Sequence, residues 1–331
     1  MKDARFDIVA VGNALVDVIA QVGDGFIAEH RLAKGQMALI DAERALSLYA
    51  AMPPGIETSG GSAANTLAGM AMLGCRCAHI GQVAADQLGA VFAHDLRNAG
   101  VAFDTPARSG GAPTGRCLIA VTPDGQRTMS TLLGASAELA PEAIDHALIR
   151  DGAILFLEGY QWDSAGPRSA MRSAIDTAQA AGRKVALTLS AEFCVAAHGA
   201  DWLALLKAGK IDILVGNEGE VTALARADDV EAAMAQIRAM VPLLVTTHGE
   251  RGATAIRGGE RVDVPAAKCE RVVDTTGAGD LFAAGFLAGQ AQAHDLKASL
   301  RLGALCAAEC ISHIGPRPQA DLKTLARPLL G

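Results

Sequence analysis

The sequence predicts an α/β protein built on a doubly wound, mostly parallel, Rossmann-like sheet with a small β-lid. In the C-terminal half, short apolar runs at 154–157, 185–189, 211–215 and 243–247 alternate with helical segments such as 164–181 and 230–240. These segments are long enough for the right-handed crossovers that parallel strands need. A hairpin pattern between residues 116 and 133 interrupts the alternation. Because a hairpin does not fit easily into a parallel sheet, we assign it to the lid.

Composition limits the kind of partner. Half of the 331 residues are hydrophobic and 36 are glycine, which provides for a sizeable core and argues against disorder. The length favours one large domain with a small additional part. The net charge is −7 and the basic residues form no run. This pattern argues against nucleic-acid and membrane partners and favours a small-molecule ligand.

The cysteines indicate a reducing compartment. They occupy positions 75, 77, 117, 194, 269, 306 and 310, an odd number without a repeated metal-ligand spacing. Buried structural thiols explain them best. The first residues lack the apolar core of a signal peptide, and no uncharged apolar run approaches the roughly 20 residues that span a bilayer. We therefore expect a cytoplasmic protein.

The N-terminal part begins with a predicted buried strand at 6–11 (FDIVAV), which ends at Gly12. Loosely alternating apolar residues then indicate strand pieces of an exposed flap, up to about residue 40. Gly60 and Gly61 precede a helix and permit close backbone approach to a ligand. A cramped helix start packed against a strand is the alternative. Asn65, on the first turn of that helix, favours the ligand.

A strand at 78–83 and a helix at 86–98 precede the hairpin. The hairpin consists of extended runs at 116–121 and 127–133, joined by the turn sequence TPDGQ. We assign residues 18–40 and 113–134 to a lid inserted in one domain that covers residues 1–331. Arg127, just after the turn, is either a solvated charge or a phosphate contact.

Ligands of doubly wound sheets bind beyond the carboxyl ends of the strands, so the residues after each apolar run are candidates. They are Asn13, Asp17, Glu158, Gly159, Tyr160, Ser190, Asn217, Glu220, Thr247, Gly249 and residues 274–280. Glu220 belongs either to a favourable acidic helix start or to a group that orients water on Mg²⁺. The common glycine-rich nucleotide loops are absent from the sequence.

Residues 273–282 (VDTTGAGDLF) combine the end of an extended run at 271–273, a glycine turn and a helix start. We expect the amides of Gly277, Ala278 and Gly279 at the helix N-terminus, where the helix dipole favours an anion. Asp280 is then either an acid that complements the dipole or a general base beside an anion hole. In phosphoryl transfer, such a base accepts the proton of the attacking hydroxyl.

Three motifs resemble the ribokinase/phosphofructokinase-B (pfkB) family of small-molecule kinases. They are residues 60–65 (GGSAAN), Asn217 with Glu220, and residues 274–280 (DTTGAGD), in the order of that family. The resemblance implies a ribokinase-like fold and ATP-dependent phosphorylation of a sugar or nucleoside hydroxyl. Residues 12–17 (GNALVD), the long insertion after them, and 113–115 (PTG) are similar to the branch that converts adenosine to AMP at its 5′-hydroxyl.

The resemblance also implies residue roles. Asp280 would be the base, with Gly277, Ala278 and Gly279 as the anion hole. Substrate contacts would come from Asn13, Asp17, Gln36, Gly60, Gly61, Asn65 and Tyr160, with Gln36 and Tyr160 near the base. ATP contacts would come from Asn217, Glu220, Thr247, Gly249, Thr275 and Arg127. Glu220 would hold Mg²⁺ through water, and Asp274, Thr276 and Gly315 would form a K⁺ site.

Two alternatives stay open at this point. One is a sugar kinase of the same family, similar to ribokinases or fructokinases. The other is a binding protein that kept the fold and lost catalysis, against which the intact Asp280 and its glycine turn argue. The sequence allows a monomer or a homodimer, because lid strands either close over one chain or pair edge to edge.

Overall fold

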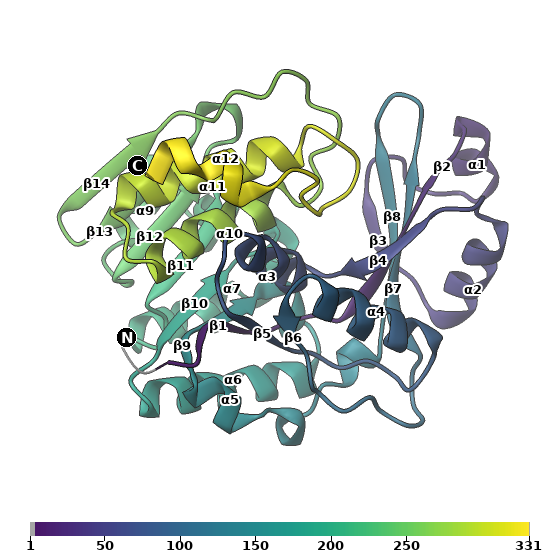
Figure 1. The fold of residues 1–331 in the computed structure, drawn as a ribbon, viewed down its shortest axis with the longest axis horizontal. Helices are drawn as coiled ribbons and strands as arrows, with labels where there is room; N and C mark the ends of the chain where they lie inside the picture. Colours follow the sequence, from purple (N-terminus) through teal and green to yellow (C-terminus); the bar gives the residue numbers. More distant parts are fainter. Residues whose placement is uncertain (1–3, 331) are drawn as a thin grey trace.

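The computed structural model describes residues 4–330. Within them, the main sheet has nine strands in the order β14-β13-β12-β11-β10-β9-β1-β5-β6. The strands from β12 to β6 run parallel, and β13 and β14 are antiparallel additions at one edge. The predicted doubly wound, mostly parallel sheet is therefore confirmed (Figure 1). In sequence order the strands are β1 (Phe6–Val11), β5 (Cys77–Ile80), β6 (Val101–Ala102), β9 (Gly152–Glu158), β10 (Lys184–Thr188), β11 (Ile213–Asn217), β12 (Leu243–Thr247), β13 (Ala253–Arg257) and β14 (Glu260–Val264).

Helices cover both faces of this sheet because alternate strand residues point to opposite sides. Ile8 and Ala10 of β1 join a core with α3, α10 and α11, whereas Val9 and Val11 join a second core with α6, α7, α8 and α9. These helices span α3 (Ser62–Met72), α6 (Ala165–Ala180), α7 (Glu192–Lys207), α8 (Glu218–Ala225), α9 (Val230–Ile237), α10 (Ala278–Ala291) and α11 (Leu296–Cys310). The remaining helices around the main sheet are α4 (Gln87–Asn98), α5 (His146–Arg150) and α12 (Leu322–Leu330), with 3₁₀ turns η1 (Ala135–Glu138), η2 (Pro141–Ala143), η3 (Gly159–Trp162) and η4 (Gly249–Arg251).

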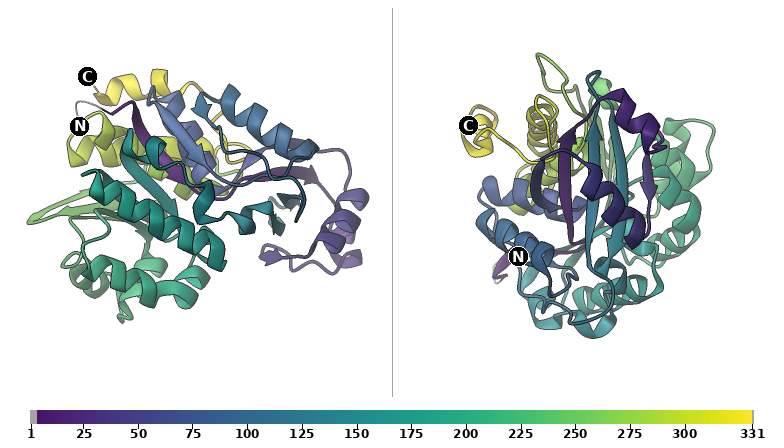
Figure 2. Two further views of the ribbon diagram at one scale, coloured as in Figure 1. Left: turned by 90° about the horizontal axis from the view of Figure 1, so that it is seen from below. Right: turned by 90° about the vertical axis from the view of Figure 1, so that its right-hand side faces the viewer.

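A second sheet stands beside the carboxyl ends of the main strands (Figure 1). Its order is β3-β8-β7-β2-β4, with bounds β2 (Leu15–Gln21), β3 (Met37–Leu39), β4 (Ile56–Gly60), β7 (Thr114–Val121) and β8 (Arg127–Gly134). The hairpin predicted from the TPDGQ turn is the antiparallel pair of β7 and β8. Figure 2 shows that α1 (Asp24–Glu29) and α2 (Ala42–Ala51) lie against the outer face of this sheet, turned away from the main sheet.

Several predicted elements need correction. Residues 271–273 do not form a strand, because the chain from β14 to α10 is a loop, in which the Val273 amide donates to the Ile311 carbonyl at 2.8 Å. The flap up to about residue 40 was predicted as strand pieces only. It also contains α1, and α2 and β4 follow it. The helical periodicity of α1 was hidden by its short length, because it has six residues and buries only Ile27.

None of the helices within residues 4–330 is long and apolar enough to cross a membrane.

Candidate active site

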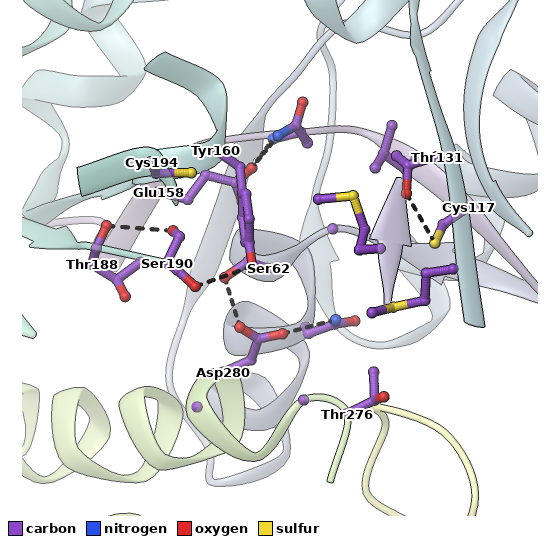
Figure 3. Close-up of a pocket in the computed structure, with 18 of the residues that line it drawn as sticks. Ser62, Cys117, Thr131, Glu158, Tyr160, Thr188, Ser190, Cys194, Thr276 and Asp280 are labelled. Carbon is purple, nitrogen blue, oxygen red and sulfur yellow. Dashed lines mark hydrogen bonds between the residues drawn. The ribbon is translucent and has the colours of Figure 1, made fainter. Parts of the chain in front are cut away.

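One cavity of about 560 Å³ lies between the two sheets. The second sheet contributes alternate residues of its strands, since side chains two apart share a face. They are Leu15 and Asp17 of β2, Met37 and Leu39 of β3, Cys117 and Ile119 of β7, and Met129, Thr131 and Leu133 of β8. Ends of the main strands contribute Asn13, Glu158, Thr188 and Asn217, and the start of α10 contributes Asp280 (Figure 3).

Asp280 is held at the cavity floor by two donors from α3. Ser62 Oγ donates to Asp280 Oδ1 at 2.6 Å (Figure 3). Asn65 Nδ2 donates to Asp280 Oδ2 at 3.0 Å. Burial raises the pKa of Asp280 above its usual value, while these hydrogen bonds and the charge of Arg317 oppose the rise. A carboxylate with a raised pKa and a fixed position is suited to accept a proton.

The glycine turn before Asp280 presents backbone amides to the cavity. Gly277 is the N-cap of α10 with φ of 78°, and a Cβ there would lie 2.7 Å from a carbon of Pro316. Gly277 and Gly279 line the cavity. The amide of Ala278 instead donates to the Thr275 carbonyl at 3.2 Å, and Ala278 is not among the lining residues. The arrangement is a helix N-terminus open to an anion.

A second glycine turn brings β4 and α3 against β2. A Cβ on Gly60 would lie 2.3 Å from the Asp17 carboxyl, and one on Gly61, with φ of 97°, would lie 2.4 Å from the Asn13 carbonyl oxygen. The two glycines are therefore needed for close packing of the chain. This agrees with the alternative prediction of a cramped helix start packed against a strand. Gly61 also lines the cavity, whereas Gly60 lies behind Asp17.

Glu158 connects this turn to β1. It is fully buried, and its carboxylate accepts hydrogen bonds from the Asn13 amide at 2.8 Å and the Ala63 amide at 2.6 Å. Its Oε1 also accepts from Asn13 Nδ2, and Asn13 Oδ1 accepts from Ser136 Oγ at 2.9 Å. Burial raises the pKa of Glu158 to about 7 against these hydrogen bonds. Asn13 is thereby fixed in one orientation.

Asn65 and Asp17 place buried side-chain oxygens at the cavity. Asn65 Oδ1 is buried without a hydrogen-bond partner in the described part of the chain. Asp17 is 6% exposed, and burial raises its pKa to about 7, with Arg317 and Arg127 lowering it and Asp280 raising it. Buried acceptors of this kind are satisfied by hydroxyl groups of a ligand.

A large apolar part of the lining belongs to the second sheet and α7. It is formed by Leu15, Met37, Leu39, Ile119, Met129, Leu133 and Phe193. Tyr160 extends this wall: its ring lies 5.9 Å from that of Phe193, and its hydroxyl donates to the Ser190 carbonyl at 3.0 Å. An aromatic or other flat apolar group fits against such a wall.

The far end of the cavity carries Asn217, Glu220, Thr247 and Thr275. Asn217 and Glu220 form a capping box at the start of α8, in which Glu220 Oε2 accepts from the Asn217 amide at 2.9 Å and Asn217 Oδ1 accepts from the Glu220 amide at 2.9 Å. Burial raises the pKa of Glu220 to about 7. The helix-start interpretation therefore holds, and the carboxylate still faces the cavity.

Some predicted residues lie outside the cavity lining. The side chain of Gln36 is exposed, because Met37 and Leu39 take the inward positions of β3. Gly249 starts η4, one turn beyond Thr247. Arg127 is not a solvated charge: it is 8% exposed and paired with Asp274, which contacts Gly315. Thr276 of the same loop does line the cavity.

Three residues help to build the site although the sequence analysis gave them no role in it. Glu158 stood among the strand-end candidates but received no role, although its position after a buried run was a usable signal. Ser62 lies inside the 60–65 motif. Arg317 had no signal, because its guanidinium reaches the Ser59 carbonyl at 2.7 Å and the Ala64 carbonyl at 3.1 Å only through the tertiary fold.

Comparison with known proteins identifies the family of the chain. The model of the pfkB carbohydrate kinase family matches residues 55–323. The solved adenosine kinase of Sinorhizobium meliloti is 45% identical, with a TM-score of 0.92, and the match covers 98% of this chain and 99% of that one. A probable sugar kinase of Rhizobium etli CFN 42 is 44% identical, also with a TM-score of 0.92, over 98% of both chains. The adenosine kinase of Saccharomyces cerevisiae is 27% identical over 93% of this chain and 96% of its own length.

Nucleoside and sugar kinases are thus both among the relatives, and all are phosphotransferases that act on a hydroxyl group. Because the family model matches residues 55–323 and two solved structures are 44% and 45% identical over 98% of the chain, the chain belongs to the pfkB family of carbohydrate kinases.

Proposed function

We propose that the protein is an adenosine kinase, which transfers the γ-phosphate of ATP to the 5′-hydroxyl of adenosine and releases AMP and ADP. The observation that carries the proposal is the combination of buried oxygen acceptors and an apolar wall in one cavity. Asp17 and the unpaired Asn65 Oδ1 offer acceptors for hydroxyl groups, and an apolar part of the lining includes Met37, Ile119 and Met129. A nucleoside has hydroxyl groups at one end and a flat base at the other.

A free sugar matches this cavity less well. Its hydroxyl groups surround the ring, and those turned toward Leu39, Met129 and Leu133 would lose water without gaining a partner. The identity to the adenosine kinase of Sinorhizobium meliloti supports the nucleoside as well. The similar identity to a probable sugar kinase keeps a sugar acceptor as the second candidate.

Asp280 acts as the general base in the proposed reaction. It takes the proton of the 5′-hydroxyl as that oxygen bonds to the γ-phosphorus and the bond to the ADP oxygen breaks. Ser62 and Asn65 hold the carboxylate in place from α3. The amides of Gly277 and Gly279, two residues that line the cavity, donate to the equatorial oxygens of the transferred group, whose charge they stabilise.

ATP would extend from this turn along Thr275, Thr247 and Asn217. The side chains of Asn217 and Glu220 at this end of the cavity fit a Mg²⁺ ion that is bound through water. Within residues 4–330, no three His, Cys, Asp or Glu side chains cluster to bind a metal directly, and Glu220 faces the cavity with oxygens shared by the capping box. When bound, Mg²⁺ neutralises phosphate charge. Asn217 and Glu220 would orient its water ligands.

An acceptor panel tests the proposal. With ATP and Mg²⁺, we expect kcat/KM for adenosine to exceed that for ribose by at least ~100-fold, because the apolar wall rewards the base and penalises a free sugar. Fructose and other nucleosides complete the panel, and Asp280→Asn protein measures background ATP hydrolysis. Turnover of a free sugar equal to or faster than that of adenosine would establish the second candidate instead.

A further inference from the structure

A buried ion pair connects the second sheet to the loop before α10. Arg127 is the first residue of β8, and its Nη2 meets Oδ2 of Asp274. The two side chains are only 6% and 2% exposed. The tip of the hairpin lies against the same loop, where a Cβ on Gly125 would be 3.6 Å from the Val273 carbonyl oxygen. The pair is therefore part of a packed contact and is shielded from water.

Asp274 organises two loops around this pair. Its Oδ1 accepts from the Thr276 amide at 3.0 Å, and its Oδ2 accepts from the Gly315 amide at 2.9 Å. The first bond shapes the turn that leads into Gly277. The second connects that turn to the loop after α11. The position of the amides at the start of α10 thus depends on the orientation of one buried carboxylate.

The three residues predicted to hold K⁺ come together here, but they do not fit a bound cation. The Asp274 carboxylate already faces a guanidinium. The carbonyl oxygens of Thr276 and Gly315 face the Cys310 thiol, at 3.4 and 3.9 Å from Sγ. Burial raises the pKa of that thiol to about 12, so it stays protonated and can donate. The thiol has one hydrogen, which the nearer Thr276 carbonyl receives, so the Asp274 carboxylate and this carbonyl already have partners.

The guanidinium supplies charge rather than a directed bond. Nε, Nη1 and Nη2 of Arg127 are buried, and none of them makes an aligned hydrogen bond with the described residues. Apolar side chains close the surroundings: Ile19, Cys117, Ile119 and Val121 pack with Met129 and Ile314. In such a place an unpaired carboxylate is strongly unfavourable, so Asp274 requires a resident cation.

We propose that the guanidinium of Arg127 is this resident cation, and that phosphoryl transfer by this chain needs no monovalent metal ion. Arg127 is then a positioning residue, which acts through Asp274 on the amides of the glycine turn. The inference concerns the kinase machinery and applies to any acceptor, so it does not depend on adenosine. In this proposal the guanidinium of a second-sheet residue takes the place that the sequence analysis gave to K⁺.

The first test uses the wild-type protein with whichever acceptor turns over fastest. Turnover is measured in tetramethylammonium buffer and again with about 100 mM K⁺ at equal ionic strength, together with the thermal midpoint. We expect both quantities to be insensitive to K⁺, with kcat changing less than about twofold, since no site gains a ligand. An activation larger than that overturns the proposal, including the case in which Arg127 leaves Asp274 when the nucleotide binds.

The second test removes the guanidinium. Arg127→Gln leaves Asp274 buried and unpaired, so we expect a lower thermal midpoint and a lower kcat, both partly restored by K⁺ but not by tetramethylammonium. The double variant Arg127→Gln/Asp274→Asn has neither charge of the buried pair and should not respond to K⁺ at this position. Arg116→Gln is the matched control, because Arg116 is a buried arginine of the same hairpin that stacks over Tyr49 instead.

Outcomes of the second test separate the roles. If Arg127→Gln keeps the thermal midpoint of the wild type, Asp274 does not need the guanidinium and the proposal is wrong. If the single and double variants respond to K⁺ alike, the ion acts elsewhere and the proposal is also wrong. Arg127→Lys, which keeps a positive charge, should stay K⁺-insensitive and closer to wild type in thermal midpoint, and it remains measurable if the glutamine variant does not fold.

Discussion

Ser62 Oγ and Asp280 Oδ1 lie 2.6 Å apart although 218 positions separate them in the sequence. The contact exists because α3 and α10 pack side by side with their first turns at the same end of the cavity. Gly69 of α3 permits this approach, since a Cβ there would be 2.7 Å from a methyl group of Leu281. Two helix starts from distant parts of the chain thereby hold one carboxylate.

Substitution of Asp280 distinguishes a base from an acid that only complements the helix dipole. Asp280→Asn keeps the size and part of the hydrogen bonding but cannot take a proton, so kcat should fall by roughly 10²–10⁴ while ATP affinity stays nearly unchanged. A dipole effect alone would cost about 0.3–1 kcal/mol of stability and leave turnover almost intact. Steady-state kinetics, nucleotide titration and a thermal melt on the same variant provide the comparison.

Asp295→Asn is the matched control for this substitution. Asp295 caps α11 by accepting from the Ala298 amide at 2.7 Å and does not line the cavity. Its replacement should affect the thermal midpoint only. Retention of more than about a tenth of wild-type turnover by Asp280→Asn would contradict the assignment as general base.

Asp17 should make stability depend on pH with a definite sign. Burial raises its pKa in the folded protein to about 7, above the unfolded value, so the folded state binds more protons between these two values. The free energy of unfolding should therefore fall as the pH rises from about 4 to about 7 and then level off. Asp17→Asn removes this loss, and should be more stable than wild type at pH 8 by on the order of 1–3 kcal/mol.

Urea unfolding at several pH values measures the difference. Asp7→Asn is a control of opposite sign, because burial raises the pKa of Asp7 but the hydrogen bonds and charge of Arg76 outweigh it and lower the pKa overall. The same Asp17→Asn variant should bind the acceptor roughly 10- to 100-fold more weakly, since hydrogen bonds to a charged group are lost. If the free energy of unfolding changes equally with pH in wild type and in Asp17→Asn, the raised pKa of Asp17 is ruled out.

The hairpin of β7 and β8 should respond to the acceptor if the second sheet acts as a lid. Its inward residues Ile119, Met129 and Leu133 line the cavity, so a bound acceptor would bury them further and slow amide exchange in both strands. Hydrogen–deuterium exchange with and without acceptor measures this. Strand β10 is the internal reference, as it lies in the middle of the main sheet. Unchanged protection of the hairpin, or protection confined to β11, would remove the lid from the mechanism.

The sequence by itself determined the elements whose signals are local. Strand β1, the β7–β8 hairpin and the helix after Gly61 follow from apolar runs, a TPDGQ turn and paired glycines, all within a few residues of each other. Asp280 was identified for the same reason, because glycine turn, carboxylate and apolar helix stand in one continuous stretch. The alternation of strands and helices also predicted the parallel sheet, since the chain can return only by a crossover.

Only the tertiary structure decided which side chains meet. Gln36 and Met37 are neighbours, but the pairing of β3 with β8 turned Met37 inward and left Gln36 exposed. Arg127 could be a surface charge or a phosphate contact until the hairpin packed on the loop of Asp274. Glu158 and Arg317 acquire their roles from amides and carbonyls of β1, β4 and α3. The physical reason is common to these cases: burial and charge pairing depend on long-range contacts, which local periodicity does not encode.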